Sequence, residues 1–249
     1  MRLRAEEALA LFGGAFALFL VAGFVIPPST VGLVCKQVAF LAIPAIVFVR
    51  ARGLGVRAGL GITVPRPAAL AGAVLIGASA WYLNLVIMVP LLDLLVQDPD
   101  RLHEIERHVG WARDPWIVRV LAIAIVPAIC EELLVRGAVA RALRPTAGIS
   151  GAVIVSAILF ALLHVSVVRM LPIALFGAVL AWGVVVTDSV VPGIVMHLLN
   201  NLITAVVLPE APQILTALTD HPLPSIGLAG AATASGIALL WRSRVSLDQ

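Results

Sequence analysis

The sequence predicts an all-α protein, a polytopic bundle of about eight transmembrane helices with a polar cavity within the membrane. Of its 249 residues, 61% are hydrophobic and 12% are charged. The mean hydropathy of +1.08 also lies far outside the range of soluble domains. The apolar residues fall into stretches of the length that a helix needs to cross a bilayer, roughly 20 residues. We expect a single integral membrane domain over residues 1–249, with residues 116–207 as a core that carries the informative motifs.

The first three expected spans are residues 8–26, 31–49 and 68–96. Pro27 and Pro28 follow the first of them and end it, because proline cannot donate the backbone hydrogen bond that continues a helix. The second span is followed by an arginine- and glycine-rich loop, and the third is the longest of the three.

A polar segment then interrupts the apolar pattern at residues 97–115. Leu102, Ile105 and Val109 recur there at helical spacing among charged residues. Such a pattern is typical of an amphipathic helix that lies in the membrane surface.

Five further spans are expected at residues 116–143, 148–165, 170–186, 190–207 and 223–241. The fourth span should end at Arg144 and Pro145, since proline disfavours helix continuation.

The distribution of arginines predicts how the chain crosses the membrane. With eight spans, both termini lie on the side that holds most arginines, which is the cytoplasmic side by the positive-inside rule. These arginines are Arg2, Arg4, Arg50, Arg52, Arg57, Arg66, Arg141, Arg144, Arg242 and Arg244. The net charge of +3 is therefore explained by topology, and we expect no nucleic-acid partner. The arginine-rich, lysine-poor composition favours a prokaryotic plasma membrane.

The most informative stretch is residues 128–137, where Glu131, Glu132 and Arg136 follow an apolar run. Charged side chains at membrane depth are costly and are kept where they pair or act. Glu132 and Arg136 are four residues apart, in the order that favours an ion pair on one helix face. Glu131 is rotated by about 100° from Glu132 and has no such partner in its own helix.

Three more polar residues interrupt later spans: His164, His197 and Asn201. Together with Glu131 they indicate a common polar cavity rather than separate buried side chains. At about 1.5 Å per residue, Glu131 and His164 lie at similar depth, whereas His197 follows the start of its span too closely. The seventh helix must therefore start deeper in the membrane, or Pro192 must mark an irregular start.

This set of residues can hydrolyse an amide. A buried carboxylate beside an imidazole can take a proton from water, and a second histidine with a carboxamide can stabilise an oxyanion. Glu131, His164 and His197 could equally hold a zinc ion, although no HExxH motif favours this.

The motifs resemble the CAAX-protease and bacteriocin-processing (CPBP, or Abi) intramembrane peptidases, which include the Ras-converting CAAX prenyl endopeptidase. The similarity rests on Glu131-Glu132-x-x-x-Arg136, Phe160-x-x-x-His164 and His197-x-x-x-Asn201 on separate spans. It implies that Glu131 and His164 activate the water and that His197 and Asn201 form the oxyanion site. Glu132 and Arg136 would support them, and Phe160 would shape the cavity wall or simply pack. It also favours a metal-free, glutamate-type mechanism, with zinc as the alternative.

Two other functions stay open at this point. Carboxylate and histidine chains also occur in proton- or ion-coupled transporters, and a non-catalytic membrane partner or immunity protein could use the same fold. For a peptidase, the expected partners are the lipid bilayer and a membrane-associated peptide or protein substrate. The sequence gives no indication of the oligomeric state.

Overall fold

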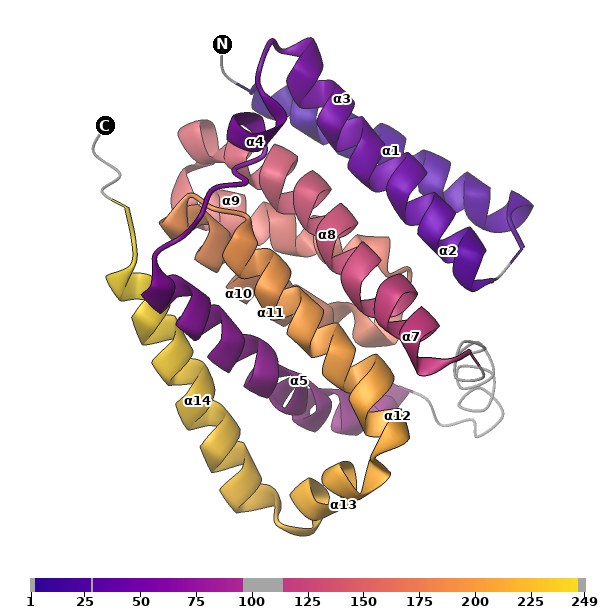
Figure 1. Ribbon diagram of the computed structural model, residues 1–249, viewed down its shortest axis with the longest axis vertical. Coiled ribbons are helices and arrows are strands. Elements are labelled where there is room, and N and C mark those ends of the chain that lie inside the picture. The colour runs from indigo at the N-terminus through magenta and orange to yellow at the C-terminus, as the bar shows by residue number, and fades with distance from the viewer. Residues whose placement is uncertain (1–2, 28, 96–113, 246–249) are drawn as a thin grey trace.

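The computed structural model describes residues 3–27, 29–95 and 114–245, and the regular structure of this part is helical throughout. The all-α prediction is confirmed. Figure 1 shows long helices running side by side across the molecule. The amphipathic helix expected around Leu102 lies outside the described residues.

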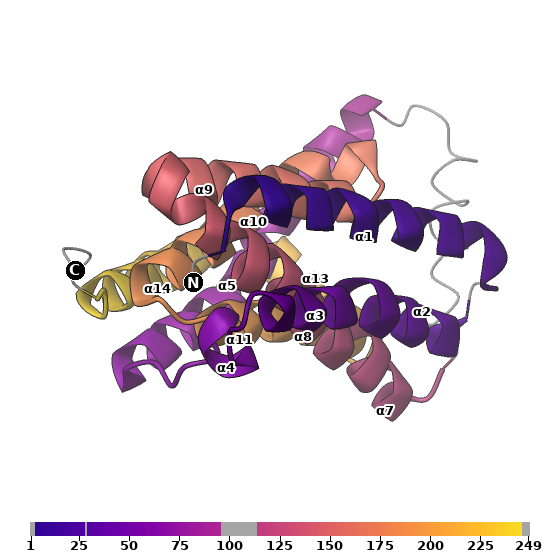
Figure 2. The same ribbon diagram turned by 90° about the horizontal axis from the view of Figure 1, so that it is seen from above.

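An N-terminal helical pair forms one outer layer of the bundle. Helix α1 (Ala5–Val25) lies beside a second rod made of α2 (Thr30–Gln37), the π-helical segment η1 (Val38–Ala42) and α3 (Ile43–Ala51), as Figure 2 shows. The side chain of Ser29 caps α2 by accepting a hydrogen bond from the backbone N–H of Gly32 at 3.0 Å. The short helix α4 (Val56–Gly59) follows this layer.

Helix α5 (Pro67–Leu95) packs against α14 (Pro222–Arg242) through two glycines. A Cβ atom at Gly72 would lie 2.6 Å from the carbonyl oxygen of Gly236, and one at Gly236 would lie 2.7 Å from that of Gly72. The backbones therefore approach too closely for any side chain, which is a common way for membrane helices to associate.

The longest helical run carries the acidic motif and turns back on itself. Its segments are α7 (Trp116–Arg119), η3 (Val120–Ile125), α8 (Val126–Glu132), η4 (Leu133–Ala140) and α9 (Arg141–Leu163). The prediction that Arg144 and Pro145 end this helix is wrong, since α9 continues through Pro145 and breaks at Gly148. Proline's fixed φ suits a helix, whereas Gly148 has φ 67° and ψ −173°, a conformation that only glycine adopts readily.

The remaining helices complete the bundle. They are α10 (Val167–Thr187), α11 (Val191–Leu202), η5 (Ile203–Val207), α12 (Leu208–Glu210), α13 (Pro212–Asp220) and α14. The described part contains 7 helical runs long and apolar enough to cross a membrane. One of them, Trp116–Leu163, contains the fourth and fifth predicted spans on either side of the break at Gly148.

Helix α11 starts at a position that is buried inside the protein. Ser189 and Val190, just before the helix, are both 0% exposed. The N–H of Val190 donates to the carbonyl of Gly61 at 2.9 Å. The helix is regular from Val191 onwards, so Pro192 does not mark an irregular start.

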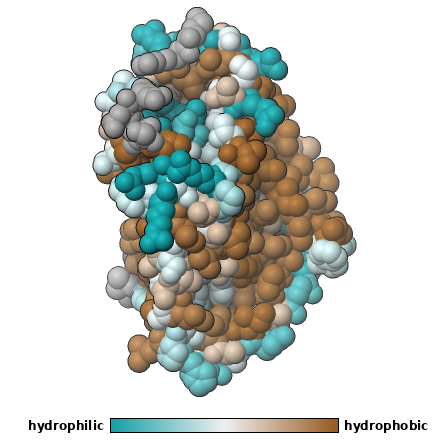
Figure 3. All heavy atoms as spheres, turned by 60° about the vertical axis from the view of Figure 1, so that its left-hand side comes forward, coloured by the Kyte–Doolittle hydropathy of each residue, from teal (hydrophilic) through white to brown (hydrophobic). Residues whose placement is uncertain are grey.

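The outer surface is that of a membrane protein. Phe24 is 92% exposed and Leu223 is 81% exposed, as expected for side chains that face lipid. In Figure 3 hydrophobic residues cover most of the visible face, and hydrophilic residues gather at its upper left and its lower edge. The structure is therefore that of an integral membrane helix bundle.

The glycine contact between α5 and α14 predicts a specific loss of stability. An added methyl group in Gly236→Ala would also meet Ile76 Cγ1 at 2.6 Å, and such overpacking typically costs about 1–3 kcal/mol. We expect the melting temperature of the purified protein in detergent to fall by several degrees. Gly230→Ala is the matched control on the same helix, because its Cβ would have nothing within 4 Å. Equal melting temperatures for the two variants would contradict the contact.

Candidate active site

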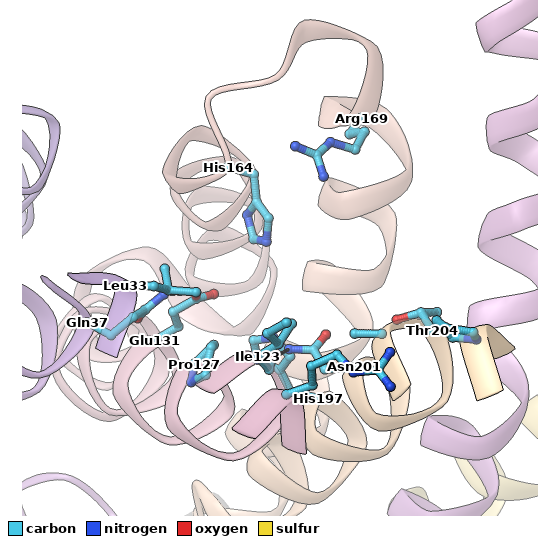
Figure 4. Close-up of a pocket in the computed structure, with 13 residues that line it drawn as sticks. Leu33, Gln37, Ile123, Pro127, Glu131, His164, Arg169, His197, Asn201 and Thr204 are labelled. Atoms are coloured by element: carbon cyan, nitrogen blue, oxygen red, sulfur yellow. Dashed lines mark hydrogen bonds between the residues drawn. The ribbon is translucent and has the colours of Figure 1, made fainter. Parts of the chain in front are cut away.

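The four residues predicted to share a polar cavity do so. Glu131, His164, His197 and Asn201 all line one cavity of about 390 Å³. They come from α8, the C-terminal end of α9, and α11, and Figure 4 shows their side chains converging on the same space. We call this cavity the polar chamber.

Gln37 at the end of α2 holds Glu131 in place, and sequence reasoning missed it. Its Nε2 donates to Glu131 Oε1 at 2.8 Å, and its side chain is 4% exposed. The other carboxylate oxygen, Oε2, is buried and has no hydrogen-bond partner within the described residues. The available signal was a glutamine inside an apolar span, which is as unusual there as the two histidines.

His164 presents a free nitrogen to the polar chamber. Its Nδ1 lies 3.0 Å from the carbonyl oxygen of Phe160, one turn earlier in α9. A carbonyl can only accept, so Nδ1 carries the hydrogen and donates it. In the neutral ring this leaves a lone pair on Nε2, which can accept a proton.

Glu132 connects the motif helix to two other side chains. Its Oε1 accepts from Arg136 Nη1 at 2.8 Å, and both side chains are 0% exposed. The ion pair predicted from the four-residue spacing is confirmed. The same oxygen lies 3.1 Å from His197 Nδ1, a contact that the sequence could not indicate because His197 is supplied by α11. The contact uses Nδ1 of His197, so Nε2 of this ring takes no part in it, as for His164.

Phe160 stands between the two histidines and the buried arginine. Its ring is edge-on to His164 and to His197, with centroid distances of 5.0 Å and 5.3 Å. The guanidinium of Arg136 lies over the ring, 4.1 Å from the centroid, where a cation is attracted to the π-electrons. Phe160 is 1% exposed, so its ring packs against both imidazoles inside the protein.

Asn201 is held by two hydrogen bonds and keeps one donor. Its Nδ2 donates to the carbonyl of Ile123 at 3.2 Å, and its Oδ1 accepts from Asn200 Nδ2 at 3.3 Å. A carboxamide nitrogen carries two hydrogens, so the second one remains for a ligand.

The site residues lie close to wide helical turns. Gln37 and Glu132 each directly precede a π-helical segment, η1 and η4, and Asn201 lies two residues before η5. Ile123, which accepts the hydrogen bond from Asn201, lies within η3. π-Helical turns are rare and often occur at functional sites, because an added residue changes the rotation of the side chains that follow.

Two arginines that sequence reasoning did not select also line the polar chamber. Arg119 is 3% exposed and forms an ion pair with Glu210. Arg169, in the first turn of α10, forms no ion pair with the described residues. In Figure 4 its guanidinium points toward His164, so it adds positive charge to the chamber.

The side chains named for zinc do not form a ready ligand set. Among the described residues, no group of three His, Cys, Asp or Glu side chains is placed to hold a metal ion. Glu131, His164 and His197 are therefore not grouped as a set of metal ligands in this arrangement.

Comparison with known families agrees with this geometry. Residues 113–203 match the family described as type II CAAX prenyl endopeptidase Rce1-like. Over this segment the chain is similar to the CAAX-protease (CPBP) family. The segment contains the two glutamates, Arg136, Phe160, both histidines and Asn201. No curated protein and no solved structure matches the chain. The family match supports a CAAX-protease-like peptidase in general.

Proposed function

We propose that this protein is an intramembrane endopeptidase that cuts a membrane-associated peptide by direct attack of water. The observation that carries the proposal is the pairing of two free acceptors in one chamber. These are Oε2 of Glu131 and Nε2 of His164. Asn201 and His197 line the same chamber and can contact the substrate carbonyl.

Water activation follows from these acceptors. A water molecule between Glu131 and His164 would donate one hydrogen bond to Oε2 and the other to Nε2. As its oxygen attacks the peptide carbonyl carbon, Glu131 takes one proton and the carbonyl oxygen becomes negative. The carboxyl group then gives this proton to the leaving amine as the C–N bond breaks, which leaves a carboxylic acid product and regenerates the site.

The oxyanion would be stabilised by Asn201 and His197. Asn201 offers the second hydrogen of Nδ2 whatever the pH. His197 can donate from Nε2 only as an imidazolium if its Nδ1–H is donated to ionised Glu132. Glu132 Oε1 lies 3.1 Å from Nδ1 and can accept this hydrogen bond. Glu132 thus has two tasks, pairing with Arg136 and orienting His197.

The proposal predicts that Glu131→Gln abolishes cleavage while the protein still folds and inserts. Loss of a general base typically costs 10²–10⁴-fold in rate. The measurement compares new peptide termini in the membrane proteomes of cells that express the wild type or the variant. Glu6→Gln, at an exposed glutamate outside the chamber, is the control and should cleave normally. A set of termini that persists in the Glu131→Gln cells would refute the role of Glu131.

Gln37 is proposed as a positioning residue for Glu131. Gln37→Met keeps the length of the side chain but removes the donor, so we expect kcat to fall about 10–100-fold with little change in KM. Gln37→Glu places a second carboxyl group against Glu131 and should be weaker still. Its activity relative to wild type should recover as the pH falls, because the added carboxyl then carries a proton to donate. A purely structural role for Gln37 would give no such pH-dependent recovery.

The reaction is proposed to need no metal ion, because no three His, Cys, Asp or Glu side chains of the described residues are grouped to hold one. Activity of the purified enzyme should survive dialysis against a strong chelator, and elemental analysis should find far less than one metal per protein. Loss of activity on chelation with recovery on adding zinc would instead establish a metallopeptidase.

A further inference from the structure

The arginines divide unequally between the two ends of the helix bundle. One end, which we call the arginine-rich end, contains the start of α1, helix α4, the start of α9 and the end of α14, and Figure 1 shows these segments on the same side of the molecule. The arginines of the described residues that lie there are Arg4, Arg50, Arg52, Arg57, Arg66, Arg141, Arg144, Arg242 and Arg244.

The opposite end, which we call the chamber end, contains the starts of α2 and α7, the connection between α9 and α10, and helix α12. Its lysine and arginines among the described residues are Lys36, Arg119 and Arg169, and Arg119 is buried in an ion pair with Glu210. The sequence between α5 and α7 adds three arginines together with four acidic residues. Because lysine and arginine are enriched on the cytoplasmic side of membrane proteins, the arginine-rich end is assigned to the cytoplasm.

The polar chamber extends from Glu131 to the chamber end. Leu33 and Arg119 lie in the first turns of α2 and α7, and both line the chamber. Thr204 and Pro209 also line it, and both are exposed. The lining therefore continues from the middle of the bundle to the helix termini on this side.

A packed layer separates the polar chamber from the arginine-rich end. The side chains of Glu132 and Arg136 are 0% exposed. One residue further along, a Cβ atom at Gly137 would lie 3.1 Å from the carbonyl oxygen of Leu60, which is also 0% exposed. None of these four residues lines the chamber, so the chamber is closed on this side.

We propose that the polar chamber opens on the face of the membrane opposite the cytoplasm, and that the substrate is a peptide segment exposed on that face. This rests on the proposed peptidase function and names its substrate class: the extracytoplasmic segments of membrane-anchored or translocated proteins. Glu131 follows the start of α7 at Trp116 by a helical length of about 22 Å, at 1.5 Å per residue. An extended segment that reaches it from the membrane surface therefore needs about seven residues, at up to 3.6 Å each.

The test measures from which side of the membrane two engineered cysteines can be reached. The starting protein carries Cys35→Ser, which removes the exposed native cysteine and leaves the buried Cys130 as an unreactive background. Thr204→Cys then reports on the chamber, and Ala58→Cys, at an exposed position of α4, is the matched control at the arginine-rich end. Spheroplasts and inverted membrane vesicles of a bacterial host are treated with a small sulfonated thiol reagent that does not cross the bilayer.

In spheroplasts, Thr204→Cys should be labelled at least tenfold more than Ala58→Cys, and inverted vesicles should give the reverse ratio. Any other pattern overturns the proposal: a reversed result places the chamber on the cytoplasmic side, and a Thr204→Cys protein that is unreactive from both sides has no open chamber.

The substrates provide a second reading. Peptide termini that disappear in Glu131→Gln cells should map to extracytoplasmic segments of their proteins, and a majority in cytoplasmic segments would overturn the proposed substrate class. Labelling needs no catalysis, so the two proposals can fail separately. If the cysteines react as expected but Glu131→Gln cells retain all cleavage, the orientation of the chamber stands and the proposed function fails.

Discussion

The buried ion pair of Glu132 and Arg136 is the interaction on which the site depends. Both side chains are 0% exposed, and each alone would carry the cost of an isolated charge at membrane depth. Neighbouring groups of the protein also contact both charges and take the place of water. Arg136 donates to the carbonyl of Gly177 at 2.8 Å and lies over Phe160, while Glu132 contacts His197. Because the two opposite charges of the pair offset each other, the chamber beside it can hold a separate carboxylate, that of Glu131.

Two glycines allow the neighbouring helices to reach this ion pair. A Cβ atom at Gly193 would lie 2.8 Å from Glu132 Oε2, and one at Gly177 would lie 2.9 Å from Phe160 Cδ1. Helices α10 and α11 can therefore approach the acidic motif closely enough to bring a carbonyl and His197 within hydrogen-bonding distance. Substituting either glycine would separate the charges from their partners, and the cost of burying them would then be uncompensated.

The sequence correctly predicted the features that depend on local residue spacing and on the free-energy cost of polar groups in the membrane. The helical class, most span positions, the Glu132–Arg136 pair and the shared chamber all followed from apolar length, four-residue spacing and the expense of buried polar groups. The sequence-based prediction failed where the structure depends on backbone conformation or on contacts between residues far apart in the chain. Pro145 was expected to end a helix that in fact breaks at Gly148, since proline's φ is helical. Gln37 meets Glu131 across 94 positions of sequence, a distance over which periodicity carries no information.

The residues proposed to carry out the reaction and a residue that positions one of them come from different parts of the chain. The carboxylates, both histidines and Asn201 lie within residues 113–203, the segment shared with the family. The group that orients Glu131 comes from α2, outside that segment. A reactive set must keep fixed distances, so it is confined to a few tightly packed helices. The surrounding helices complete the chamber, and α2 also orients Glu131 through the hydrogen bond from Gln37.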